Sequence, residues 1–225
     1  MNAQLKQLIL KDLDLNRKFI PAVVAAGLLS ILIASLSELS EFTFLIGSLL
    51  FITTLVAFGV MLAIYSVQQE REKRIHLFVL SMPISSAQYT LAKVISSLLC
   101  FAIPWALLFA TVVIGILGLE SAMDGYLPYV TLVMLYFLCN FCMLLAAIVV
   151  SSSEKVMIAA ILVTNISITI ALQVFARIPS VAQQMETDQI VWSPTVIWLV
   201  FAEILFCFFC LAVAVYIQKQ KTDLV

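Results

Sequence analysis

The sequence predicts an all-α integral membrane protein with six transmembrane helices, and three observations support this prediction. Hydrophobic residues make up 64% of the 225 positions and charged residues 11%, against about a quarter charged in a soluble domain. The mean hydropathy is +1.14. Uncharged stretches long enough to cross a bilayer alternate with short charged segments. A soluble enzyme and a disordered tail are therefore excluded, and the continuous apolar runs exclude a β-barrel.

The first 18 residues precede the first span and predict an amphipathic interfacial helix. Apolar side chains fall near one helical face, and most polar side chains fall elsewhere. The apolar positions are Leu5, Leu8, Ile9 and Leu13. This pattern is typical of a helix lying on the inner leaflet. The alternative is a charged start that only fixes the topology.

Six spans follow within a single integral membrane domain that covers residues 1–225. We expect them near residues 19–37, 44–67, 91–117, 127–150, 156–176 and 195–217. Pro21 stands in the first turn of the first span, where a missing amide donor costs little. Five uncharged stretches contain no Asp, Glu, Lys or Arg, and the last apolar stretch contains only Glu203. We interpret the first apolar stretch as a retained span rather than a cleaved signal peptide.

The distribution of Lys and Arg predicts the orientation. Arg177 alone lies on one side of the predicted membrane, and the other eleven basic residues lie on the opposite side. Basic residues concentrate on the cytoplasmic side of membrane proteins. Both termini are therefore expected in the cytoplasm, with the chain in the cell membrane. The net charge of −1 gives no indication of a nucleic-acid partner.

The segment between the second and third spans carries the strongest pattern. A run of charges over residues 70–74 precedes an apolar turn and a proline. An S-x-x-Q capping box at Ser85 and Gln88 then predicts a helix running through Lys93 into the third span. Exposed apolar side chains ringed by charge are typical of a docking site for a soluble partner. The alternative is a linker lying on the membrane.

The segment from Ile178 to Pro194 connects the last two spans on the outer side. It is too apolar for a solvated loop and too interrupted for a span. One interpretation is that it dips into the outer interface with Trp192 as an anchor. The other is a plain outer loop with an interfacial tryptophan.

The sequence offers little catalytic or metal-binding chemistry. The five cysteines lie in apolar stretches, and we interpret them as buried thiols despite the C-x-x-C spacing of Cys139/Cys142 and Cys207/Cys210. His76 is the one histidine, and no P-loop or G-x-S-x-G motif occurs. We therefore expect no catalytic residue, cofactor or metal on this chain.

Glu203 is the one charged residue at membrane depth. An intramembrane carboxylate is a candidate for transport chemistry or for a bond between helices. Asn140, Asn165 and Gln173 are the other polar candidates within the spans.

The loop pattern resembles the permease subunits of type 2 ABC exporters. Glu70-Arg71-Glu72-Lys73-Arg74, then Leu77 to Ser85, then Tyr89 to Lys93 resemble the acidic-basic run, the "leu-leu-ser-leu-pro-(ile/val)-ser" stretch and the entering lysine of that family. Six spans, cytoplasmic termini and an elbow helix before the first span also match its layout. Lys73-Arg74 and Ser86 depart from many relatives, which bears on the subfamily.

The resemblance implies a coupling helix around residues 70–82 that docks on a separate cytoplasmic ABC ATPase. The implied ATPase-coupling residues are Glu70, Arg71, Glu72, Arg74, Ile75, Leu77, Phe78, Leu80 and Pro83. ATP and Mg²⁺ would bind that ATPase, and this chain would not be an enzyme. Two permease chains, as a homodimer or a heterodimer, would form the substrate pathway within membrane lipid. Residues 178–193 would match the family's outer half-buried helices near the substrate exit.

Three functions remain open at this point. The first is the exporter permease, whose cargo could be a peptide, a lipid or a drug. The second is a proton-coupled carrier that uses Glu203. The third is an assembly protein without transport, in which the same loop docks a partner that is not an ATPase.

Overall fold

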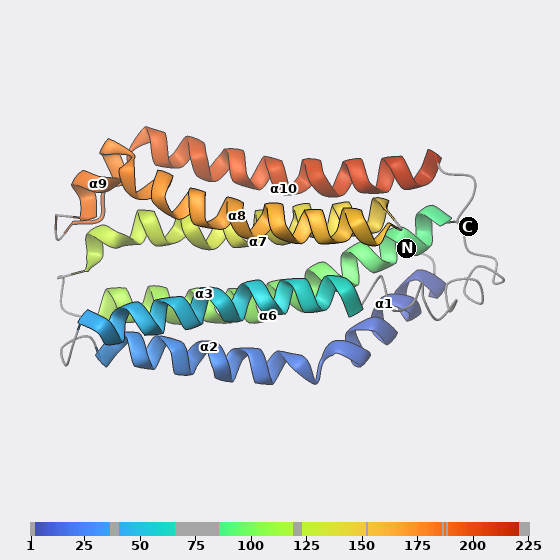
Figure 1. The fold of residues 1–225 in the computed structure, drawn as a ribbon, viewed down its shortest axis with the longest axis horizontal. Helices are drawn as coiled ribbons and strands as arrows, with labels where there is room; N and C mark the ends of the chain where they lie inside the picture. Colours follow the sequence, from blue (N-terminus) through green and yellow to red (C-terminus); the bar gives the residue numbers. More distant parts are fainter. Residues whose placement is uncertain are drawn as a thin grey trace.

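The computed structural model describes residues 3–36, 41–65, 86–118, 123–151, 153–185, 187 and 189–220, and over these residues the protein is helical without a strand. The predicted all-α class is therefore confirmed. In order, the helices are α1 (Ala3–Asn16), α2 (Phe19–Ser35), α3 (Glu41–Ala63), α6 (Ser86–Gly118), the 3-10 turn η3 (Asp124–Tyr126), α7 (Leu127–Val150), α8 (Glu154–Arg177), α9 (Pro179–Met185) and α10 (Pro194–Gln220). The long helices lie side by side in an elongated bundle (Figure 1).

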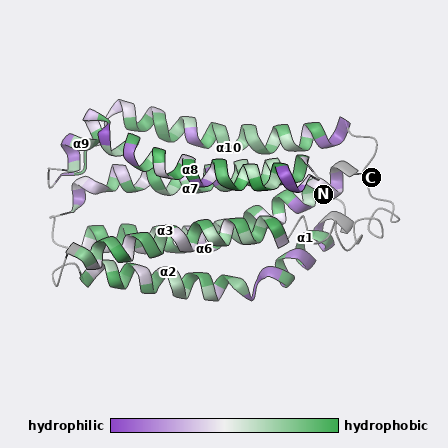
Figure 2. Ribbon diagram, viewed as in Figure 1, coloured by the Kyte–Doolittle hydropathy of each residue, from purple (hydrophilic) through white to green (hydrophobic). Residues whose placement is uncertain are grey.

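Five of the described helices are long and apolar enough to cross a membrane by themselves, namely α3, α6, α7, α8 and α10. A sixth span is obtained if α1 and α2 count as one, although their axes differ by 50°. Apolar residues dominate the middle of the helices, and hydrophilic residues gather near the two ends of the bundle (Figure 2). This is the hydropathy profile of a multi-pass membrane protein.

Local sequence explains where several helices begin. Pro194 stands at the first position of α10, where its missing N–H leaves no bond unmade. Ser193 precedes it, and its Oγ accepts a hydrogen bond from the Val196 N–H at 3.3 Å, which caps the helix. The α6 helix begins at Ser86 and includes Lys93, as the capping box predicts. It also continues through Pro104.

The helices form two groups that meet along the middle of the bundle. In Figure 1, α2, α3 and α6 lie on one side and α7, α8 and α10 on the other. Stacked aromatic rings join the two groups: Phe101 of α6 stacks on Phe141 of α7 with centroids 4.2 Å apart, and Phe58 of α3 stacks on Phe101 at 6.0 Å. The Trp105 indole adds a hydrogen bond of 2.7 Å to the Met134 carbonyl. Aromatic packing and one hydrogen bond thus hold α6 against α7.

The α6 helix is longer than a bilayer requires. Its 33 residues span about 50 Å at 1.5 Å per residue, against a hydrocarbon thickness of about 30 Å. The α1 helix lies beside its first turns, at the end of the bundle where α10 ends (Figure 1). We refer to this end as the α1 end and to the opposite one as the α9 end.

Candidate functional site

The contact between α1 and the start of α6 is the most specific polar feature of the described structure. Leu8 and Ile9 of α1 are buried against Ala92 of α6. Leu13, Tyr89 and Ile95 are the partly buried side chains packed around them. The apolar face predicted for residues 1–18 therefore packs on α6, and its position relative to a membrane surface remains a prediction.

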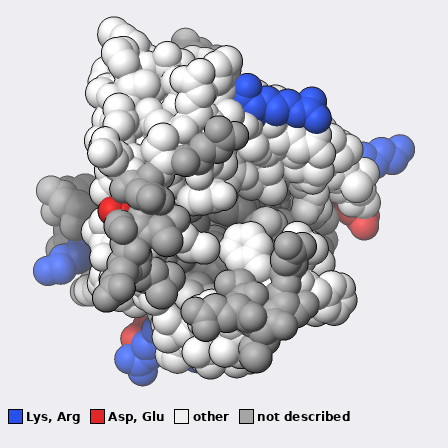
Figure 3. Space-filling model, turned by 90° about the vertical axis from the view of Figure 1, so that its left-hand side faces the viewer, with Lys and Arg blue, Asp and Glu red and all other residues white. Residues whose placement is uncertain are grey.

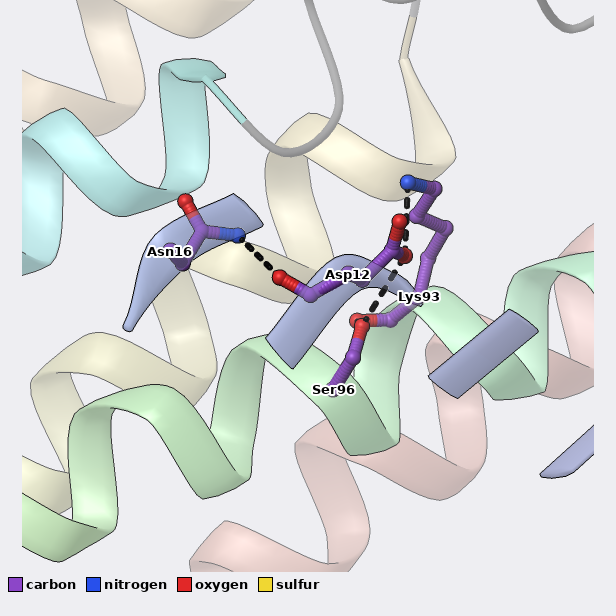
Figure 4. Close-up of polar contacts among 4 residues, drawn as sticks. All are labelled: Asp12, Asn16, Lys93 and Ser96. Carbon is purple, nitrogen blue, oxygen red and sulfur yellow. Dashed lines mark hydrogen bonds and ion pairs between the residues drawn. The ribbon is translucent and has the colours of Figure 1, made fainter. Parts of the chain in front are cut away.

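A buried ion pair lies within this contact. The Lys93 ammonium is 2.7 Å from Oδ2 of Asp12, and the two side chains are 4% and 2% exposed. The Ser96 hydroxyl lies within hydrogen-bond distance of the same oxygen, at 3.2 Å. The Asn16 amide donates to the backbone carbonyl of Asp12 at 2.9 Å. Figure 4 shows how Asp12 reaches from α1 toward Lys93 and Ser96 on α6.

The burial of this pair determines how much it contributes to the stability of the fold. Exposed ion pairs contribute little to the free energy of unfolding. Removing one partner of a buried pair leaves an uncompensated charge and lowers the free energy of unfolding by about 3–5 kcal/mol. The exposed Arg17–Asp14 pair at the end of α1 offers a direct contrast, because its side chains are 75% and 69% exposed. The Asp12–Lys93 pair therefore fixes α1 on α6, and the Asp14 pair does not.

Asp12 was not among the residues predicted for a site, although the sequence carries a signal for it. Asp12 lies four residues after Leu8 and three after Ile9, so it falls on the apolar face of α1 rather than on its charged face. A carboxylate on an apolar stripe indicates a buried partner. Lys93 was expected in the helix that enters the third span and matches the family pattern, but the sequence did not indicate a partner for it.

The nine predicted coupling residues lie outside the described residues. They fall within positions 66–85, between the end of α3 and the start of α6. Both of these helix ends lie at the α1 end of the bundle (Figure 1). The role of these residues remains a prediction, and so does the position of His76.

Glu203 lies in α10, and its surroundings differ from those of Asp12. Both of its carboxyl oxygens are buried and have no hydrogen-bond partner among the described residues. The Cys139 thiol of α7 donates to its backbone carbonyl at 3.2 Å. Among the described residues, the side chain therefore has no hydrogen-bond donor that would stabilise an ionised carboxylate at the α7–α10 contact.

The cysteine pairs of α7 and α10 meet in the same region. The sulfur atoms of Cys139 and Cys207 are 3.2 Å apart, and all five cysteines are free thiols. The C-x-x-C spacing alone did not predict this approach, because it depends on how two distant helices pack. The described residues hold no group of three or more His, Cys, Asp or Glu side chains arranged to bind a metal ion.

The other polar candidates lie on or against α8. Asn140 of α7 is buried and donates to the Thr164 carbonyl at 2.8 Å and to the Ser167 hydroxyl at 3.1 Å. These bonds tie α7 to α8. Asn165 and Gln173 are instead exposed.

At the α9 end the chain folds back over the bundle. Val181 of α9 is fully buried with Val196 of α10 and Leu132 of α7, so this segment is not a plain loop. Gly125 of η3 lies so close to the carbonyl oxygens of Gln184 and Thr187 that a Cβ would clash with them. Seen from this end, the described surface is mostly uncharged, and the visible charged side chains lie toward its periphery (Figure 3).

A shallow apolar groove runs between α3 and α8 over the surface of α7. Val56, Gly59, Phe137, Phe141 and Ile168 are among the residues that line it. It leaves room for no more than about one water molecule. In this conformation the groove, as formed by the described residues, is therefore too small for a transported molecule.

Comparison with known proteins identifies the family. The family model described as "ABC-2 family transporter protein" matches residues 7–220, which is nearly the whole chain. No curated protein and no solved structure matches the chain. The match includes most of α1 and every described helix that could span a membrane. The chain therefore belongs to the ABC-2 family of membrane-spanning transporter proteins.

Proposed function

We propose that this chain is the permease subunit of an ATP-driven exporter that couples to a separate cytoplasmic ABC ATPase. The observation that carries the proposal is the family match over residues 7–220. The chain itself would not be an enzyme, since ATP and Mg²⁺ would bind the partner. Its role would be to form the substrate pathway and to change conformation when the ATPase closes.

The proposed orientation places the α1 end in the cytoplasm of the cell. Most of the described basic residues lie in α1, at the start of α6 and α8 and at the end of α10, whereas Arg177 ends α8 at the opposite end. The positive-inside rule then places both termini in the cytoplasm. It also places residues 66–85 on the side where an ATPase would dock.

We further propose that a second copy of the chain faces α8. The outward face of α8 carries exposed Asn165, Thr169 and Gln173, which are four residues apart and form one polar ridge. Polar side chains at membrane depth usually face protein or water rather than lipid. The exposed side chains of α10 include Trp198, Phe201, Leu205, Phe208 and Phe209, a set suited to lipid.

A pair of chains would also supply the missing pathway. The α3–α8 groove by itself is too shallow to hold a substrate, and the polar ridge lies on the face of α8 that we propose meets the second copy. Two such faces opposed across a two-fold axis would enclose a larger space lined by apolar groups and a few amides and hydroxyls. A peptide, a lipid or a drug would suit that lining.

The experiment that tests the proposal is purification of the tagged chain in mild detergent, with mass spectrometry of the proteins that accompany it. We expect a soluble ATPase with a P-loop in stoichiometric amount. The Leu77→Asp/Phe78→Asp double variant should insert into the membrane but lose the ATPase, because it places charges where apolar anchors are predicted. Retention of the ATPase would show that the docking segment is wrongly assigned.

A matched control keeps that result interpretable. Leu10→Asp changes an apolar residue of α1 that is 53% exposed and has no predicted role in docking. It should leave the amount of bound ATPase unchanged. A chain that purifies without any P-loop protein would instead favour the carrier or the assembly protein.

A further inference from the structure

The start of α6 is embedded in the protein. Residues on several sides of its first turns are buried, which a helix protruding into solvent would not show. They are Thr90, Ala92, Lys93, Val94, Ser96 and Ser97. Motion of the chain where it enters α6 at Ser86 would therefore be passed to whatever packs on these turns.

The α1 helix is one of the elements that packs there, and Asp12 is its polar link. The Asp12 carboxylate binds Lys93 and lies 3.2 Å from the Ser96 hydroxyl on α6, and its backbone carbonyl accepts the Asn16 amide. Asn16 is the last residue of α1, directly before the 50° bend into α2. One residue thus connects the start of α6 to the bend (Figure 4).

The chemistry of the pair makes this connection stiff. Separating Asp12 from Lys93 would leave the Asp12 carboxylate without its cation in an apolar contact formed by Leu8, Ile9 and Ala92. A surface pair such as Arg17–Asp14 can open at little cost because water replaces the partner. The buried pair therefore favours α1 and the start of α6 moving together.

We propose that Asp12 and Lys93 are positioning residues that join α1 to the start of α6 as one rigid unit, so that displacement of the ATPase-docking segment reaches the bend between α1 and α2. The inference rests on the proposed function for its final step, because the docking segment directly precedes Ser86. Its structural step concerns α1 and α6 alone and can be tested without the ATPase.

The first test is hydrogen–deuterium exchange of the purified full-length chain in detergent. Asp12→Asn should accelerate amide exchange in residues 6–20 and 86–97 by about tenfold or more, because the two helices then open separately. Exchange in α8 should not change. The Asp12→Lys/Lys93→Asp charge swap should restore slow exchange, and Asp14→Asn should match the wild type. Unchanged exchange in Asp12→Asn would overturn the inference.

The second test follows coupling in the purified complex with the P-loop ATPase. We would measure the ATP hydrolysis rate per ATPase in the folded complex and divide it by the rate of the ATPase alone. This quotient is the coupling ratio. Asp12→Asn should keep the ATPase bound but change this ratio by about threefold or more, and the charge swap should reverse the change. A merely structural role would lower the yield without altering the ratio, and that result would overturn the inference.

A variant that does not fold and a wild-type chain that binds no ATPase each leave a decisive measurement. If Asp12→Asn gives no folded protein, Asp12→Glu keeps the charge but lengthens the side chain by one methylene. It should alter the ratio by about twofold, and an unaltered ratio would contradict the inference. If the wild-type chain binds no P-loop ATPase, the proposed function fails, while the exchange experiment still decides whether the pair joins α1 to α6.

Discussion

Asp12 at the α1–α6 contact and Glu203 at the α7–α10 contact both place a carboxyl group out of contact with solvent. Asp12 has an ammonium group at 2.7 Å and a hydroxyl at 3.2 Å. The carboxyl oxygens of Glu203 have no hydrogen-bond partner among the described residues. A buried carboxylate needs such partners to remain charged. Asp12 therefore joins two helices as an anion, whereas Glu203 is suited to remain neutral.

The largest expected effect is the loss of one partner of the α1–α6 pair. Asp12→Asn should lower the free energy of unfolding by about 3–5 kcal/mol, because it removes the carboxylate of a buried ion pair and leaves the Lys93 ammonium buried without that carboxylate. Thermal unfolding in detergent, followed by near-UV circular dichroism, measures this loss.

Asp14→Asn is the matched control for that change. It removes the same charge from the same helix, but from an exposed pair. It should lower the free energy of unfolding by no more than about 1 kcal/mol. Equal losses in the two variants would show that the burial of the Asp12 pair has no energetic consequence.

A smaller effect is expected from Ser96→Ala. This change removes the hydroxyl beside Oδ2 of Asp12 and should lower the free energy of unfolding by about 1–2 kcal/mol. This loss is smaller than the one expected for Asp12→Asn. Ser30→Ala provides a comparison, because the buried Ser30 hydroxyl donates only to the Ala26 carbonyl of its own helix. A loss at Ser96 no larger than that at Ser30 would indicate that the hydroxyl does not stabilise the carboxylate.

The smallest effect is expected at the second carboxyl group. Glu203→Gln should change the free energy of unfolding by less than about 1 kcal/mol, because a neutral amide of the same shape replaces a carboxyl group without bonded partners. Vesicles containing the purified chain should show no proton flux that depends on Glu203, as followed with a pH-sensitive dye. Proton flux in the wild type that the Gln variant abolishes would contradict the exporter and favour the proton-coupled carrier.

Some features of this protein could be predicted from the sequence, and the two carboxyl groups show which could not. The helices were predictable because uncharged runs such as residues 94–119 and 125–153 permit little else in a membrane protein. The start of α6 followed from the capping box at Ser85 and Gln88. These signals are local, so one segment contains all the information needed.

Contacts between distant segments were not predictable in the same way. Asp12 and Lys93 pair only because α1 packs on α6, and Cys139 meets Cys207 only because α7 packs on α10. Glu203 was recognisable as an intramembrane carboxyl group, but its lack of partners depends on the packing around it. The apolar face of α1 was predicted, whereas its use against another helix required the fold.

The central claim is that two copies of this chain work with a separate ATPase. The most direct measurement is the mass of the complex that contains the tagged 24.9 kDa chain after extraction from membranes, by native mass spectrometry. The account predicts two copies of the chain bound to two copies of a P-loop ATPase. A stable species of one chain or several chains without any ATPase would contradict it.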